Sequence, residues 1–128
     1  MVHVKYGLYE NDFQLSVCGH AGYDKKGSDI VCAGVSALVR ALQVCLERDL
    51  FLSDAAFIEK AVDDGFAGFR VADTEDCELA RRIYHFFFMC VSGLREIAEQ
   101  YPDYVEITDI AALEASYIDT PEQTAENE

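Results

Sequence analysis

Two runs of alternating apolar residues near the N-terminus constrain the fold of this 128-residue chain more than any other feature. Apolar side chains recur at every second position in each run: Val2, Val4, Tyr6 and Leu8, then Phe13, Leu15 and Val17. A period of two places such side chains on one face of a β-strand. Because Glu10, Asn11 and Asp12 between the runs are typical turn residues, the pattern predicts a β-hairpin with one buried face.

A helical period follows after a polar, glycine-bearing segment over positions 21–28, which is typical of a mobile loop. Beyond this segment, apolar residues are spaced four and three apart, as on one face of a helix: Val31, Val35, Leu38, Leu42 and Cys45. Ser28 or Asp29 is available as the N-cap residue. We therefore expect a core helix that extends to about Leu50.

The middle of the chain predicts a second hairpin. Two β-like runs, 56–62 and 66–71, flank the segment Asp63-Asp64-Gly65. An Asp-Gly pair between two such runs is a strong hairpin signal, because glycine adopts the positive φ that a tight turn requires.

A second helix and a last strand are predicted after this hairpin. Thr74 is expected to be the N-cap of the helix, with Glu75 and Asp76 in its first turn and Pro102 ending it. Its expected apolar face contains Ala80, Tyr84, Phe87, Val91, Leu94 and Ala98. Gly93 within the helix predicts a close contact between helices. Residues 104–108 predict one more strand.

This order of elements, strand-strand-helix-strand-strand-helix, predicts a two-layer α+β domain with an antiparallel-rich sheet packed on two helices. A chain of 128 residues with 51% hydrophobic content is long enough to bury one core without disulfides or a structural metal. We expect a single catalytic domain over residues 1–118. Residues 119–128 are acidic and polar, which predicts a disordered tail.

Composition narrows the classes of partner and compartment. A net charge of −14 would repel a phosphate backbone, so the chain is not expected to bind nucleic acid directly, and a basic protein is the expected partner. Five cysteines without a CxxC pair favour a reducing compartment. No unbroken apolar run approaches the roughly 18 residues of a membrane span, and no export signal is recognised, so we expect a cytoplasmic protein without membrane contact.

Cys32 and His20 are the residues that point to chemistry. Cys32 falls in the first turn of the predicted core helix, where unpaired backbone amides and the positive helix end favour a thiolate. His20 lies just beyond the second strand, and the connecting loop is long enough to bring the helix start back to the strand end. A histidine and a cysteine joined in this way by a loop are typical of a nucleophile and its general base. Alternatively, Cys32 is a buried small hydrophobe and His20 only binds loop backbone.

Asp29 and Ser36 are candidate supporting residues. Asp29 either orients His20 or only caps the helix, and Ser36 either lines the site or bonds back to a carbonyl of the preceding turn. A zinc site built from Cys18, His20 and Cys32 is disfavoured because the ligand spacing is poor. We expect neither a metal nor a cofactor.

The segment from Gly19 to Ser36 resembles the signature of the ribosomal-processing cysteine protease (Prp) family. That signature is Gly-His-Ala, a glycine-bearing loop, Asp-Ile-Val-Cys-Ala and Val-Ser, which Gly19–Ala21 and Asp29–Ser36 match. The resemblance implies that His20 is the base and Cys32 the nucleophile, supported by Asp29 and Ser36. It also implies a loop that grips the substrate, with residues Gly19, Ala21, Gly22, Tyr23, Gly27 and Ser28.

The same resemblance implies a homodimer that removes the N-terminal extension of a large-subunit ribosomal protein. Because members of the same family also occur in phages, an alternative substrate is a phage capsid or scaffold protein. An adaptor without catalysis, which docks a basic partner during ribosome assembly, is a further alternative. Gly34 replaces an alanine that is common in the family, and it is expected to allow a close backbone approach, for example by substrate.

Overall fold

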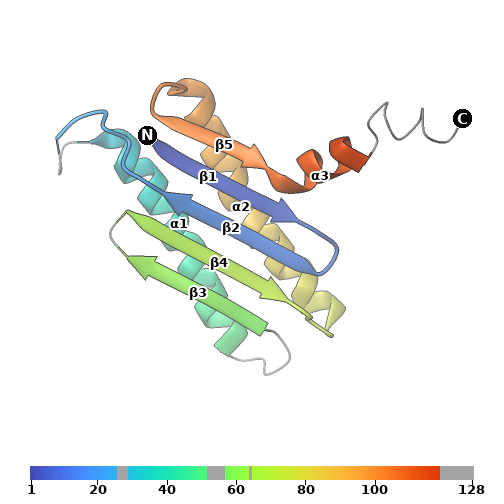
Figure 1. The fold of residues 1–128 in the computed structure, drawn as a ribbon. Helices are drawn as coiled ribbons and strands as arrows, with labels where there is room; N and C mark the ends of the chain where they lie inside the picture. The colour runs from blue at the N-terminus through green and yellow to red at the C-terminus, as the bar shows by residue number, and fades with distance from the viewer. Residues whose placement is uncertain (26–28, 52–56, 64, 119–128) are drawn as a thin grey trace, which may run out of the picture.

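The computed structural model describes residues 1–25, 29–51, 57–63 and 65–118 of the chain. Its elements are β1 (Val2–Leu8), β2 (Asp12–Cys18), α1 (Ile30–Phe51), β3 (Phe57–Asp63), β4 (Phe66–Ala72), α2 (Cys77–Gln100), β5 (Val105–Asp109) and α3 (Ile110–Ile118) (Figure 1). The predicted tail over 119–128, and Gly27 and Ser28 of the predicted loop, lie outside the described residues.

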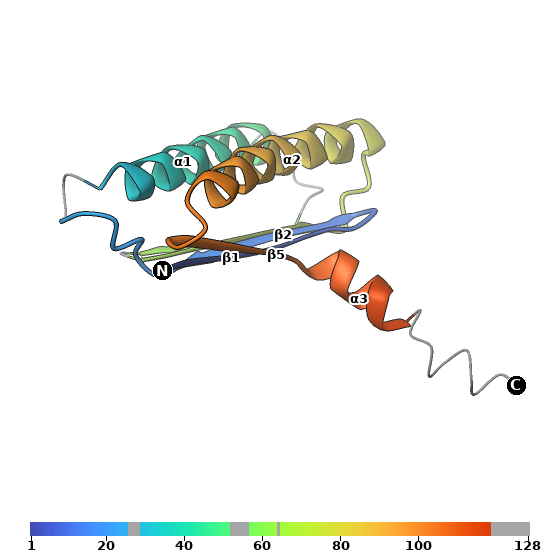
Figure 2. The same ribbon diagram turned by 90° about the horizontal axis from the view of Figure 1, so that it is seen from above.

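The strands form one five-stranded sheet in the order β3-β4-β2-β1-β5. Neighbouring strands are antiparallel, except that β5 runs parallel to β1. Figure 2 shows that α1 and α2 lie side by side over one face of this sheet, whereas α3 projects beyond the other face. The predicted two-layer α+β fold with an antiparallel-rich sheet is therefore confirmed.

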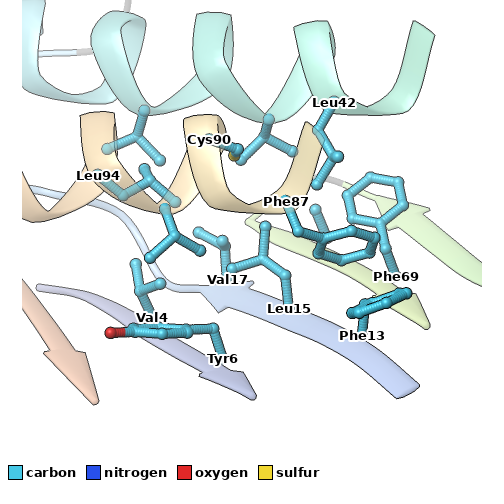
Figure 3. Packing of buried hydrophobic residues seen from close by; sticks show 14 of the residues in the cluster. Val4, Tyr6, Phe13, Leu15, Val17, Leu42, Phe69, Phe87, Cys90 and Leu94 are labelled. Atoms are coloured by element: carbon cyan, nitrogen blue, oxygen red, sulfur yellow. The ribbon is translucent and has the colours of Figure 1, made fainter. Parts of the chain in front are cut away.

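The hydrophobic core fills the space between the sheet and the two long helices (Figure 3). The alternating residues of the first hairpin are buried there, as predicted, among them Val4, Phe13 and Leu15. The buried stripe of α1 is Val31, Val35, Val39, Leu42 and Leu46. Leu38 and Cys45, which the sequence pattern placed in this stripe, are only half-buried because the helix presents the neighbouring residues to the sheet.

α1 is also long and apolar enough, by length and composition over Ile30–Asp49, to cross a membrane. Such a helix is weak evidence for a membrane span, because the core helix of a folded domain passes the same test. Here one apolar stripe of α1 packs on the sheet as part of the core.

The N-cap of α2 is Asp76, so the prediction of Thr74 was wrong. The Asp76 carboxylate accepts hydrogen bonds from the amides of Glu78 (2.9 Å) and Leu79 (3.1 Å). Thr74 is instead buried before the helix, where its carbonyl accepts a hydrogen bond of 2.7 Å from the Asn11 side chain. The positive φ of Asp73, 58°, turns the chain at this point and delays the helix start.

Two glycines mark where α1 and α2 approach each other closely. A Cβ atom on Gly93 would lie 2.8 Å from both terminal carbons of Leu38, which confirms the predicted helix contact. A Cβ atom on Gly34 would lie 3.2 Å from Cδ1 of Ile97, also on the opposite helix. Gly34 therefore serves helix packing, and the expectation that it admits substrate is not supported.

The short helix α3 was not predicted. Asp109, the last residue of β5, accepts a hydrogen bond of 3.1 Å from the amide of Ala112, in the manner of an N-cap. Tyr9 donates a hydrogen bond of 3.0 Å from its hydroxyl to Glu114 and so connects α3 to the first hairpin.

Candidate active site

A cavity of about 790 Å³ lies between the N-terminal half of α1, the C-terminal end of β2 and the N-terminal end of β4. Six of the residues that the sequence singled out line it: Gly19, His20, Gly22, Asp29, Cys32 and Ser36. Its apolar wall includes Val2, Val17, Val35, Val39, Phe66 and Ala67. The structure therefore brings the predicted nucleophile and the predicted base into one cavity.

Cys32 is the third residue of α1 and its side chain is half-buried. Its Sγ accepts a hydrogen bond of 3.2 Å from the backbone amide of Ala21. Such a bond is stronger when the sulfur is ionised, since charged acceptors bind donors more tightly. The Cys32 sulfur thus lies at the helix start within reach of one backbone donor.

Asp29 caps α1 and anchors the preceding loop. Its Oδ1 accepts a hydrogen bond of 2.9 Å from the Cys32 amide, and its Oδ2 accepts bonds from the amides of Tyr23 (3.0 Å) and Asp24 (3.4 Å). The hydrogen bond from the Cys32 amide, helped by those from the loop amides, lowers the pKa of the Asp29 carboxyl. Both oxygens are engaged by backbone, which favours the capping role over the orientation of His20.

His20 is exposed, and its ring lies over Gly65 in the turn between β3 and β4. No hydrogen bond joins His20 to Cys32 or to Asp29 in the described part of the chain. Catalytic hydrogen bonds are often long in enzymes without substrate and shorten in the complex. The two side chains line the same cavity.

Tyr23 anchors the same loop at a second place. Its ring meets Tyr101 and Tyr104 edge-on, with centroid distances of 5.6 Å and 5.1 Å. These two tyrosines belong to the connection between α2 and β5, which the sequence analysis did not link to the site. Edge-to-face packing of aromatic rings contributes about 0.5–1.5 kcal/mol beyond burial. The loop is thus held both at the start of α1 and at the end of α2.

Ser36 is exposed and lines the cavity one helical turn after Cys32. Its hydroxyl makes no hydrogen bond to a described residue, so the alternative of a bond to the preceding turn is not observed. Within the described ranges, no three His, Cys, Asp or Glu side chains come together in a group that could hold a metal ion.

A cysteine at a helix start and a histidine that lines the same cavity are the two residue types that a cysteine protease uses. Family comparison agrees with this class. The chain belongs to the family of the cysteine protease Prp, whose family model matches residues 1–106. No curated protein matches the chain.

Solved structures share the fold. The chain resembles the essential ribosomal processing protease Prp from Staphylococcus aureus with a covalently linked product peptide, at 24% identity and a TM-score of 0.68, covering 85% of this chain and 99% of that one. The same protease with a substrate peptide gives 21% identity and a TM-score of 0.61, covering 85% and 99%. A Streptococcus mutans protein gives 22% identity and a TM-score of 0.60, covering 85% and 93%.

Proposed function

We propose that the chain is an endopeptidase that removes the N-terminal extension of a large-subunit ribosomal protein, with Cys32 as nucleophile and His20 as base. The observation that carries this proposal is that both side chains line one cavity at the start of α1. The S. aureus protease of similar fold is described as a ribosomal processing protease. Further support comes from the net charge of −14, which suits a basic ribosomal substrate.

In this mechanism His20 takes the proton from the Cys32 thiol, and the sulfur attacks the scissile carbonyl carbon to form a C–S bond. His20 then gives the proton to the leaving amine as the C–N bond breaks. Water, deprotonated by His20, attacks the resulting thioester, and the Cys32 sulfur leaves and regains a proton from His20. No cofactor takes part in these steps.

An amide is required near the sulfur to bind the oxyanion that forms during the attack. The Cys32 amide already donates to Asp29 at 2.9 Å. The Ala21 amide, 3.2 Å from Sγ, is the better placed donor, because it already points at the sulfur beside which the oxyanion forms. We assign this role to Ala21 as part of the proposed mechanism.

The test uses a ribosomal protein with its N-terminal extension as substrate. Cys32→Ser should lower cleavage by at least about 10³-fold while circular dichroism shows a folded protein. Cys45→Ser is the matched control, since Cys45 is also half-buried in α1 but does not line the cavity. Undiminished cleavage by Cys32→Ser would refute the proposed role of Cys32, whereas a wild-type protein that binds the substrate without cleaving it would favour the adaptor alternative.

We also propose that the protein acts in the cytoplasm as a homodimer. The homodimer rests on the family resemblance, and the compartment rests on the five cysteines without a CxxC pair. Sedimentation equilibrium of the full chain measures the oligomeric state, and a monomer at the concentration used for the cleavage assay would contradict the dimer.

A further inference from the structure

We infer that Gly65 is a positioning residue for His20, because a side chain at Gly65 would occupy the space that the imidazole ring fills. A Cβ atom on Gly65 would lie 2.8 Å from Nε2 of His20, 3.4 Å from Cε1 and 3.5 Å from Cδ2. The first distance is shorter than any normal contact between such atoms. The ring therefore rests directly on the backbone of the β3–β4 turn. This inference rests on the proposed role of His20 as the base.

The backbone next to His20 is fixed to the same turn. The amide of Gly19 donates a hydrogen bond of 2.8 Å to the carbonyl of Gly65. After β2, Gly19 is therefore hydrogen-bonded to Gly65, and the ring of the next residue, His20, lies against Gly65. Both Gly65 and His20 line the cavity that contains Cys32.

The contact with Gly65 matters because little else restrains the ring. His20 is exposed, and its ring nitrogens make no hydrogen bond to the described residues. Asp29, for which orientation of the ring was one of two predicted roles, binds backbone amides. The geometry therefore assigns to a glycine of the turn the orienting task that a carboxylate performs in a catalytic triad.

Gly65 also has a positive φ of 73°, so a substitution changes the backbone as well as the space above it. Two variants separate these effects. Asparagine tolerates the left-handed region much better than alanine, yet both residues carry a Cβ atom. If the ring contact is decisive, Gly65→Asn and Gly65→Ala disturb His20 to a similar extent, and if backbone strain is decisive, only Gly65→Ala does.

The experiment follows the histidine rings directly by NMR in the full chain, with circular dichroism as the check of folding. In Gly65→Asn we expect the ring signals of His20 to shift, while those of His3 and His85 stay constant. In the cleavage assay we expect kcat to fall by about 10-fold to 10²-fold with KM nearly unchanged. In the His20→Ala background, Gly65→Asn should have no further effect.

Unchanged His20 signals in folded Gly65→Asn would overturn the inference, as would full kcat. If Gly65→Ala fails to fold, Gly65→Asn carries the test. The NMR readout does not depend on proteolysis. If His20 shifts but the wild-type protein cleaves no ribosomal substrate, the positioning of the ring by Gly65 stands and only the proposed function fails.

Discussion

Asp29 connects the two halves of the candidate site at the scale of single residues. One carboxylate caps α1 at the amide of Cys32 and also binds the loop amides of Tyr23 and Asp24. Cys32 and the loop that follows His20 are therefore held by the same side chain. Any change in its charge is expected to affect both.

Asp29→Asn tests this connection through its pH dependence. The folded-state pKa of Asp29 is below its usual value, so its ionised form stabilises the folded protein above about pH 4, and this contribution is lost as the pH falls through the lowered pKa. Asparagine is an equally good N-cap, but it presents one oxygen instead of two. In urea unfolding at neutral pH, Asp29→Asn should be less stable than the wild-type protein. The difference should shrink in acid, and a difference that is independent of pH would contradict this account.

Sequence reasoning predicted candidate residues that line one cavity, but not all of their contacts. Asp29 could be predicted as a cap because acidic residues are common there. The contact between His20 and Gly65, and that between Tyr23 and Tyr104, join segments far apart in the chain. Local periodicity carries no signal for such pairs, since they arise only once the sheet has brought its strand ends together.

At the scale of elements, strands and long helices were predictable because periodicity is a local property. The alternating runs predicted the first hairpin, and the Asp-Gly pair between two β-like runs predicted the second. The start of α2 was not predictable from Thr74 and its neighbours, because the positive φ of Asp73 and the hydrogen bonds of Asn11 decide where the helix can begin. The short helix α3 was missed because it has no clear apolar period, although Asp109 provides a capping signal.

The α1–α2 contact predicts opposite effects for two similar substitutions. Alanine gains about 1 kcal/mol of helix propensity over glycine in either helix. At Gly93 the new methyl group would lie 2.8 Å from Leu38, and overpacking of this kind costs about 1–3 kcal/mol. At Gly34 a single atom, Cδ1 of Ile97, would lie 3.2 Å from the new methyl group, so a shift of a few tenths of an ångström relieves the contact. Gly93→Ala should therefore be destabilising, whereas Gly34→Ala should be neutral or stabilising.

Urea unfolding measures both variants, and Gly93→Ala combined with Leu38→Ala supplies the control. If the clash with Leu38 is the cause, the combined variant should lose less stability than the two single changes predict together. Equal changes in the free energy of unfolding for Gly93→Ala and Gly34→Ala would contradict the prediction that only the Gly93 contact is too tight for a methyl group.

The charge of the whole molecule predicts how cleavage responds to salt. A net charge of −14 attracts a basic substrate at long range, and salt weakens this attraction because the Debye length falls from about 10 Å at 0.1 M to about 3 Å at 1 M. We expect kcat/KM for the intact ribosomal protein to decrease with added salt. A short neutral peptide that contains the same cleavage site is the control and should respond little. A flat response with the intact substrate would exclude electrostatic steering.

The five cysteines of the molecule provide an internal comparison for the central claim. Cys18 and Cys77 are exposed, whereas Cys32 is half-buried and therefore less accessible to a reagent. Burial raises the pKa of the Cys90 thiol to about 12, so this residue should stay unreactive in the folded protein. If exposure alone governed reactivity, Cys18 and Cys77 would react before Cys32.

The most direct measurement is therefore the order in which limiting iodoacetamide labels the native protein at about pH 6, mapped by mass spectrometry. We predict that Cys32 is labelled first, ahead of the more exposed thiols, and that His20→Ala slows the labelling of Cys32 alone. Labelling of Cys18 and Cys77 before Cys32, unaffected by His20→Ala, would contradict the claim that Cys32 is an activated nucleophile.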